Sequence, residues 1–313
     1  MRKRIAIIGA GVMGSNHART VNNSPDFTIG LVIDSDEKRA IALAEQYGVP
    51  HSISIDSALA CDASIVATNT ETHYESAKKL IEEGQPILVE KPLTMRLEET
   101  QHLCDLSLKT DTPLMCGFVE RFNPAISAAR KVVQGQIVHL TATRHSPHPA
   151  RATTGVIEDL LIHDLDLALQ FFVPDVEAQS VAKFKPENAQ HIEIAEVSLI
   201  GGQNQIAHLS TSRWGQRKIR RWSLSTNHQT VEVDLLQQTV VAYENIDQEV
   251  GPSGGASYRT RTVIDYPFIE RAGEPLSLQL AHFARLLEDK SQLSEECIGI
   301  VRTHDVLNTI ING

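Results

Sequence analysis

The chain has 313 residues, of which 42% are hydrophobic and 22% are charged, and its formal net charge is −10. This length predicts two domains, and the acidic balance argues against a nucleic-acid partner or a membrane surface. The apolar runs are too short to cross a bilayer, and the basic start of the chain lacks the apolar stretch of a signal peptide. The cysteines, at positions 61, 104, 116 and 297, have no Cys-x-x-Cys spacing. This pattern favours reduced thiols in a cytoplasmic protein and no metal site.

The first predicted strand covers residues 4–8 and leads into Gly9-Ala10-Gly11-Val12-Met13-Gly14, with a helix predicted directly after it. In such a unit the free backbone N–H groups and the helix dipole face the same point, which makes a site for an anion. Gly9 would make the turn, Gly11 would let the backbone approach a pyrophosphate, and Gly14 would let the helix pack closely on the strand. The expected cofactor-binding residues of this dinucleotide site are Gly9, Gly11, Val12, Met13 and Gly14.

The second predicted strand, residues 28–33, ends at Asp34. An acid about 20 positions after the last glycine is expected to bond the ribose 2′-hydroxyl of a dinucleotide. We therefore predict cofactor contacts from Asp34 and its neighbour Ser35. A carboxylate repels the 2′-phosphate of NADP, which favours NAD, although Lys38 and Arg39 keep NADP as an alternative. The other interpretation is an ordinary glycine turn followed by a surface aspartate.

Strands and helices alternate through the first 118 residues. This alternation predicts an α/β domain with a doubly wound parallel sheet of Rossmann type, spanning residues 1–118. Ligands bind at the carboxyl ends of the strands in such sheets, so polar residues at those ends are predicted to contact the cofactor. The further strands are expected at 63–67, 86–89 and 113–118, the helices at 36–47, 73–83 and 97–108, and the polar contacts at Thr68, Asn69, His73, Glu90 and Lys91.

Lys91 is the candidate for proton transfer in this half of the chain. It follows the predicted strand 86–89 and lies between Glu90 and Pro92. A lysine near an oxidised nicotinamide feels a positive charge and desolvation, and both lower its pKa from roughly 10.4 toward the range useful in proton transfer. The alternative interpretation is a surface Lys-Pro pair in a loop.

The second half of the chain is different in kind. A helix over 125–134 and a strand over 137–145 precede a strand-rich region, which predicts a large, mostly antiparallel open sheet with helices on one face. We place this α+β domain at residues 119–313 and expect a homodimer or homotetramer that forms through the sheet. Arg213, Arg217, Lys218, Arg220 and Arg221 are interpreted as a solvated rim of the sheet, with a phosphate contact as the alternative. Strands are expected at 178–183, 192–200, 205–212, 219–225, 230–235 and 239–242, and helices at 274–287 and 301–311.

Residues 155–172 carry a second group of candidate catalytic side chains. As one continuous helix, this stretch places Asp159, His163 and Asp166 at positions i, i+4 and i+7, on one face. An aspartate one turn from a histidine can orient the ring and raise its basicity. The alternative interpretation is a surface helix with a polar stripe.

Together these motifs resemble the glucose–fructose oxidoreductase and inositol dehydrogenase family, Gfo/Idh/MocA. The resemblance rests on the glycine turn 9–14, on residues 66–68 with His73, on Glu90-Lys91-Pro92, and on Gly155, Asp159, His163 and Asp166. It implies an NAD-dependent dehydrogenase that oxidises a secondary alcohol of a sugar, with Lys91, Asp159 and His163 as catalytic residues. Hydride would pass from a sugar carbon to NAD while His163 takes the hydroxyl proton, Asp159 orients His163, and Lys91 polarises the oxygen or relays the proton. Lys91 and His163 could also exchange these roles.

Within the family, residues 116–125, Arg144 with 147–151, and 155–157 resemble the UDP-N-acetylglucosamine 3-dehydrogenase group. This resemblance implies a nucleotide sugar that is oxidised at C3 and whose phosphates meet arginine side chains, by charge and fork geometry. The alternatives are an inositol or free-monosaccharide dehydrogenase and, from another class, an NAD-binding regulator without chemistry. The implied substrate contacts are Arg121, Asn123, Arg144, Arg151 and His163.

Overall fold

The computed structural model describes residues 2–148, 154–172, 176–187, 189–249, 258–270 and 273–313. The chain divides into two compact units. Unit 1 contains Met1–Val119 and Gly273–Asn308, and unit 2 contains Glu120–Ala272 and Thr309–Gly313. We describe each unit by itself.

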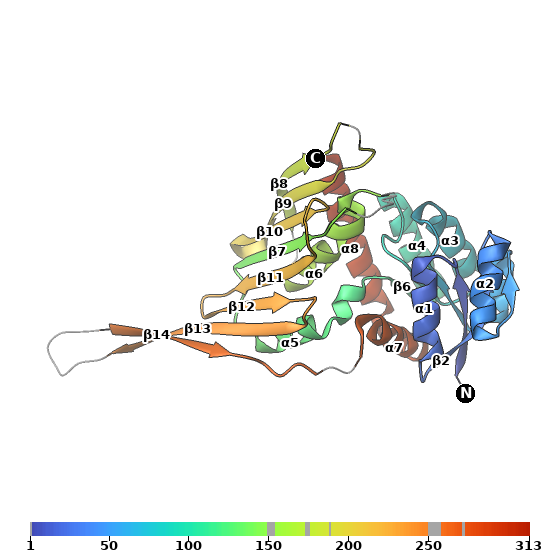
Figure 1. The fold of residues 1–313 in the computed structure, drawn as a ribbon, viewed down its shortest axis with the longest axis horizontal. Helices are drawn as coiled ribbons and strands as arrows, with labels where there is room; N and C mark the ends of the chain where they lie inside the picture. Colours follow the sequence, from blue (N-terminus) through green and yellow to red (C-terminus); the bar gives the residue numbers. More distant parts are fainter. Residues whose placement is uncertain (1, 149–153, 173–175, 188, 250–257, 271–272) are drawn as a thin grey trace. The chain divides into compact units, whose positions relative to one another are not determined.

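Unit 1 contains a sheet of six parallel strands in the order β3-β2-β1-β4-β5-β6. Figure 1 labels two of these strands, β2 and β6, together with helices α1 to α4. The residues from Ile5 to Ile8 are all buried, as are those of β4, because helices cover both faces of such a sheet. The strand order reverses direction between β1 and β4, and open α/β sheets bind ligands at this kind of switch point. The strands are β1 Lys3–Ile8, β2 Phe27–Ile33, β3 His51–Ser52, β4 Ala63–Val66, β5 Ile87–Val89 and β6 Leu114–Cys116.

The helices of unit 1 connect these strands, and right-handed crossovers place α1 and α2 on one face and α3 and α4 on the other. Helix α2 begins where the Asp36 carboxylate accepts the backbone N–H groups of Lys38 and Arg39, and it ends at Gly48, which has a left-handed φ of 64°. These elements confirm the predicted Rossmann-type sheet. Among the helices of the described ranges, none is long and apolar enough to span a membrane. The bounds are α1 Val12–Asn22, α2 Glu37–Tyr47, α3 His73–Glu82, α4 Leu97–Thr110, and the 3₁₀ helices η1 Ile55–Ala60 and η2 Thr70–Thr72.

The segment Gly273–Asn308 belongs to unit 1, whereas we expected residues 119–313 to stay together. It contains α7, Pro275–Glu288, and most of α8, Leu293–Asn312. Phe283 of α7 is fully buried and stacks on Phe27 of β2 with 6.1 Å between ring centroids. The helical pattern shows that α7 has an apolar face, but it does not say which sheet that face will cover.

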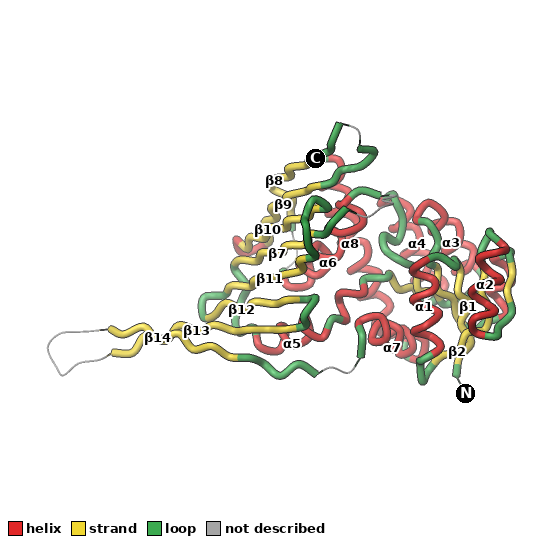
Figure 2. Tube along the Cα trace, viewed as in Figure 1, coloured by secondary structure: helices red, strands yellow, loops and turns green. Residues whose placement is uncertain are grey.

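Unit 2 contains an eight-stranded sheet in the order β14-β13-β12-β11-β7-β10-β9-β8 (Figure 2). Strands β7 and β10 are parallel and the other neighbours are antiparallel. Helix α5, Pro124–Val132, packs on β12 and β13, and α6, Ile162–Phe171, packs on β7 and β10. The mostly antiparallel open sheet with helices on one face is therefore confirmed. The strands are β7 His139–His145, β8 Glu177–Phe184, β9 Ile194–Gly201, β10 Gln205–Ser212, β11 Ile219–Ser225, β12 Gln229–Asp234, β13 Thr239–Glu249 and β14 Tyr258–Asp265.

One edge of this sheet was not predicted. Strand β13 is longer than the expected 239–242, and β14 had no predicted counterpart. Residues 260–265 of β14 are threonine, charged and aliphatic side chains, and five of these six residues are exposed. This part of β14 covers no buried core, so no alternation of apolar and polar residues marks it in the sequence.

The stretch 155–172 is not one continuous α-helix, and that prediction is wrong. Residues Ile157–Leu161 form a π-helical turn, and α6 begins only at Ile162. A π-helix closes its hydrogen bonds over five residues instead of four. The α-helical spacing that was expected to align Asp159, His163 and Asp166 along one stripe therefore does not apply across this segment.

Candidate active site

Three glycines determine the geometry of the turn between β1 and α1. Gly9 has a φ of +99°, and a Cβ at this position would lie 2.4 Å from the carbonyl oxygen of Ala67. A Cβ at Gly14 would lie 1.7 Å from the Gly9 oxygen, so only glycine lets α1 approach the turn this closely. At Gly11, by contrast, a Cβ would meet no described atom within 4 Å, which leaves open space for a ligand beside the backbone.

The first turn of α1 is open to solvent. The side chain of Val12 is 81% exposed and that of Met13 is 37% exposed. Gly11 is the N-cap residue of α1 and has no side chain to satisfy the first backbone N–H groups. These donors and the helix dipole form the anion site that the sequence predicts. The site fits the pyrophosphate of a dinucleotide.

A pocket of about 290 Å³ lies against this turn within unit 1. Ile33 and Ala67 belong to its apolar wall, and Ile53 and Ile55 contribute from the segment around β3. Its volume is at the lower end of the range of small-molecule sites. The pocket brings together six of the predicted cofactor-binding residues: Gly9, Gly11, Asp34, Ser35, Thr68 and Asn69.

Asp34 anchors the glycine turn to the end of β2. Its Oδ2 accepts the Ala10 N–H at 2.7 Å, and its Oδ1 accepts the Asp36 N–H at 2.8 Å and Arg39 Nη2 at 3.0 Å. A carboxylate has about four acceptor positions, so these bonds leave capacity for a ribose hydroxyl. Arg39, whose side chain is 56% exposed, brings a positive charge into the same pocket.

His73 is buried and supports two loops. Its Nδ1 lies 3.0 Å from the carbonyl oxygen of Pro92, and its Nε2 lies 3.1 Å from that of Thr68. The ring therefore connects the loop after β4 with the loop after β5. We expected a direct cofactor contact, whereas the structure gives His73 a role in holding Thr68 beside the pocket.

Glu90 and Lys91 follow β5 at the carboxyl end of the sheet. Glu90 is buried, with His17 Nε2 at 2.7 Å from its Oε1 and the Lys91 N–H at 3.2 Å from its Oε2. Burial by itself would raise the pKa of Glu90, but the hydrogen bond and charge of His17 and the charge of Lys91 outweigh it and lower the pKa below its usual range. Glu90 is therefore an ionised carboxylate in the interior, and Lys91 is half-buried.

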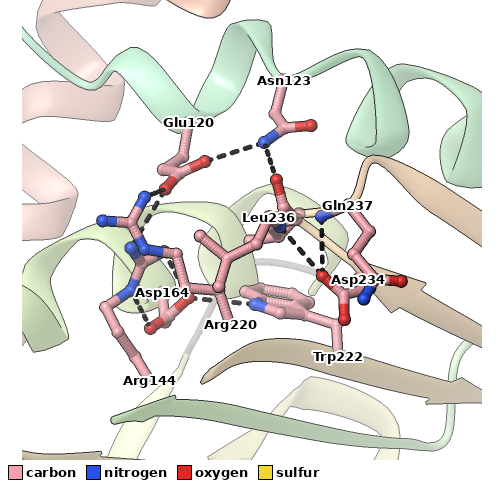
Figure 3. Close-up of polar contacts among 10 residues, drawn as sticks. Glu120, Asn123, Arg144, Asp164, Arg220, Trp222, Asp234, Leu236 and Gln237 are labelled. Carbon is pink, nitrogen blue, oxygen red and sulfur yellow. Dashed lines mark hydrogen bonds and ion pairs between the residues drawn. The ribbon is translucent and has the colours of Figure 1, made fainter. Parts of the chain in front are cut away.

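Arg144 is the centre of a buried charge network in unit 2 (Figure 3). Its side chain is 2% exposed, and its Nε and Nη2 contact both carboxylate oxygens of Asp164 at 2.6 and 3.0 Å. Its Nη1 lies 3.0 Å from Glu120 Oε1. Burial disfavours the charged guanidinium, but the two carboxylates outweigh burial and raise the pKa of Arg144. Burial likewise opposes ionisation of Glu120, but Arg144 and Arg220 lower the pKa of Glu120.

Three further side chains bond to the carboxylates of this network. Arg220 Nη1 contacts Glu120 Oε1 at 3.0 Å, and Trp222 Nε1 donates to Asp164 Oδ1 at 3.0 Å. Asn123 donates to Glu120 (Figure 3). It also donates to the carbonyl oxygen of Leu235, while its Oδ1 caps α5.

These contacts correct three of the sequence interpretations. Arg144 and Asn123 are core residues whose polar groups are used inside unit 2, so the expected substrate contacts are wrong for both in this conformation. Arg220 is part of the network and not only of a solvated rim. The predicted substrate contact Arg151 lies outside the described residues.

Two more arginines hold the acids of the 155–172 stretch. Arg121 contacts both carboxylate oxygens of buried Asp166, at 2.8 and 2.5 Å. Arg213 Nη2 contacts Asp159 Oδ2 at 2.7 Å, and its Nη1 donates to the carbonyl oxygen of Thr154.

Sequence reasoning missed Arg213, which we assigned to a solvated rim although its side chain is only 3% exposed. A signal was present in the sequence position of Arg213, directly after β10. In β10 every second residue, from 205 to 211, is buried, and residue 213 continues this series.

His163 is half-buried on the first turn of α6.

The fold and the candidate nucleotide site are those of proteins that bind a dinucleotide in a Rossmann-type domain. This statement rests on the open space at Gly11, where an anion could bind, beside the acid Asp34 at the end of β2.

Comparisons with known proteins agree with this class. A family model described as "Oxidoreductase family, NAD-binding Rossmann fold" (GFO_IDH_MocA) matches residues 3–118. UDP-N-acetylglucosamine 3-dehydrogenase from Acidithiobacillus ferrooxidans is 30% identical over 243 residues, which cover 77% of this chain and 76% of that protein. Inositol 2-dehydrogenase from Rhizobium meliloti is 30% identical over 179 residues, about half the length of each protein, at 54%. A solved structure of the Acidithiobacillus ferrooxidans enzyme has a TM-score of 0.84 at 24% identity, covering 99% of this chain and 97% of that chain.

The chain belongs to the Gfo/Idh/MocA oxidoreductase family.

The charge network predicts a large difference between two arginines of unit 2. Arg144→Met leaves two buried carboxylates without their shared cation, and we expect it to lower the free energy of unfolding by about 3–5 kcal/mol. The measurement is urea denaturation followed by tryptophan fluorescence, because both tryptophans of the chain, Trp214 and Trp222, lie in unit 2.

Arg221→Met is the matched control. The Arg221 side chain is 60% exposed and pairs with Asp234 at 3.3 Å. Exposed pairs of this kind contribute less than about 1 kcal/mol. Equal losses in the two variants would contradict the structural role of Arg144.

Proposed function

We propose that this protein oxidises a secondary alcohol of a sugar with NAD, and that its substrate is a nucleotide sugar oxidised at C3, such as UDP-N-acetylglucosamine. The observation that carries the proposal is the extent of similarity to the Acidithiobacillus ferrooxidans enzyme. That match covers 243 residues, whereas the match to the Rhizobium meliloti inositol 2-dehydrogenase covers 179. Since the cofactor unit is common to many dehydrogenases, similarity that extends further along the chain is the better guide to the substrate.

NAD is the proposed cofactor because Asp34 places a buried carboxylate in the pocket beside the glycine turn. A carboxylate accepts a ribose hydroxyl and repels a 2′-phosphate. The positive charge of Arg39 would attract a 2′-phosphate, but its guanidinium already contacts Asp34 Oδ1 at 3.0 Å. The acceptor capacity of Asp34 for a ribose hydroxyl supports a preference for NAD, and the positive charge of the exposed Arg39 supports residual use of NADP.

In the proposed reaction, bound NAD supplies the acceptor for the hydride. Gly11 and the first turn of α1 would hold its pyrophosphate, and Asp34 its ribose. His163 takes the proton of the sugar hydroxyl as general base. Asp159, whose carboxylate Arg213 holds at 2.7 Å, would orient His163 from the π-helical turn Ile157–Leu161. Lys91 polarises the hydroxyl oxygen or relays the proton. The reverse assignment of His163 and Lys91 is the alternative within the same proposal.

A substrate panel tests the function. We expect NAD reduction with UDP-N-acetylglucosamine and little or none with free N-acetylglucosamine or myo-inositol, because binding to a nucleotide sugar uses its phosphates and base as well as the sugar. NADP in place of NAD should give slower turnover at equal concentration. A C3-deuterated substrate should transfer its deuterium to NAD. Turnover of myo-inositol without turnover of any UDP-sugar would favour the alternative, an inositol or free-monosaccharide dehydrogenase.

The catalytic assignment is tested with Lys91→Ala and His163→Ala. Loss of a general acid or base lowers kcat by about 10²–10⁴-fold, and we expect a loss in this range for each variant. Lys109→Ala and His102→Ala are matched controls, because both side chains are exposed on α4. Near-normal rates in the two site variants would defeat the assignment.

We also propose that a second copy of the chain covers the open face of the eight-stranded sheet. On the strands that pack on α6, the side of the sheet away from the buried core carries exposed Ile206 of β10, and Ile200 is exposed on the adjacent β9. An uncovered sheet of this size favours self-association. Light scattering coupled to size exclusion should give a dimer or tetramer mass for the wild type and a smaller mass for Ile206→Glu. A monomeric wild type would exclude this part of the proposal.

A further inference from the structure

A buried acid–histidine pair in unit 1 has no role in the reaction proposed above. His17 Nε2 lies 2.7 Å from Glu90 Oε1, and the two side chains are 2% and 9% exposed. His17 is on the buried face of α1, three residues after Gly14, and Glu90 directly precedes Lys91. The pair therefore connects the helix that begins at the glycine turn with the residue before the candidate proton-transfer lysine.

The Glu90 carboxylate is fixed from two further directions. Its Oε2 accepts the backbone N–H of Lys91 at 3.2 Å. On the side of β6, a Cβ at Gly117 would lie 3.0 Å from both the Cα and the Oε2 of Glu90, so the absence of a side chain at residue 117 makes room for the carboxylate. Glu90 thus occupies a closely packed position between α1, its own loop and the end of β6.

The Glu90 carboxylate is kept ionised by its neighbours. A buried carboxylate is costly unless it is hydrogen-bonded and paired. The groups that keep Glu90 ionised are His17, which faces it from α1, and Lys91 in its own loop, while Gly117 adds no charge.

We propose that His17 and Glu90 are positioning residues for Lys91. His17 holds the Glu90 carboxylate in one orientation, and Glu90 in turn fixes the Lys91 backbone. Two hydrogen bonds thus connect α1 with Lys91, one from His17 to Glu90 and one from the Lys91 N–H to Glu90. This inference rests on the proposed role of Lys91 in proton transfer.

The test compares Glu90→Gln, His17→Gln and His17→Ala with the control Glu98→Gln, which changes an exposed carboxylate on α4. Misplacement of a catalytic group by about 1 Å costs about 10²-fold, so we expect Glu90→Gln and His17→Ala to lower kcat by about 10- to 100-fold with a smaller change in KM for NAD. His17→Gln keeps an N–H donor near the Nε2 position and should retain more activity than His17→Ala. A double-mutant cycle with Glu90→Gln should show coupling between the two residues.

A readout that does not need turnover separates this inference from the proposed function. NMR of ¹³C-methylated lysines, assigned with Lys91→Arg, reports directly on the surroundings of Lys91. In Glu90→Gln we expect the Lys91 methyl resonance to shift, because the carboxylate that holds both His17 and the Lys91 backbone N–H is replaced by a neutral amide, and in Glu98→Gln we expect no shift.

An unchanged Lys91 methyl resonance in Glu90→Gln would overturn the inference, even if the variant is less stable, because a merely structural pair would lower stability alone. A wild type that oxidises no sugar while Lys91 still responds to Glu90→Gln would defeat the proposed function and leave the influence of the pair on Lys91 standing.

Discussion

The missing side chain at residue 14 is the steric condition on which unit 1 depends. A Cβ there would lie 1.7 Å from the Gly9 carbonyl oxygen, so the helix α1 can sit this close to the turn only with glycine at that position. The close approach leaves the first N–H groups of α1 facing open space at Gly11. It also carries His17 to within 2.7 Å of Glu90. One packing contact therefore sets both the anion site and the surroundings of Lys91.

In unit 2, the free-energy cost of burying charged side chains determines how the central residues are arranged. Arg144, Glu120 and Asp164 are all nearly inaccessible, and each is tolerated because the others neutralise and hydrogen-bond it. A buried ion pair of this kind adds less to stability than its Coulomb energy suggests, since desolvation offsets it. What it does fix is geometry, because both carboxylates require the guanidinium in one orientation.

The two units contribute differently to an oxidoreductase of this family. The nucleotide site rests on backbone geometry and on one acid, and these features are shared by many oxidoreductases. Selectivity for a substrate has to come from side chains elsewhere, and a family-level match over residues 3–118 says nothing about them. For this reason the longer match, 77% of the chain, carries more weight for the substrate than the family model does.

The sequence by itself determined the Rossmann-type sheet, the glycine turn and the acid at Asp34, because strand periodicity, turn glycines and their spacing are local properties of the chain. It also marked the strands of the second sheet that have a buried side. Only the tertiary structure decided that β14 forms the edge, that the segment after Gly273 packs with unit 1, and that Arg144 and Arg213 are internal. The partners of these arginines are 20 to 54 residues away along the chain, at Asp164, Glu120 and Asp159. The sequence does not show whether a charged residue will be solvated or will pair with a carboxylate far away along the chain. Only the packing of the folded chain brings the arginine and the carboxylate together.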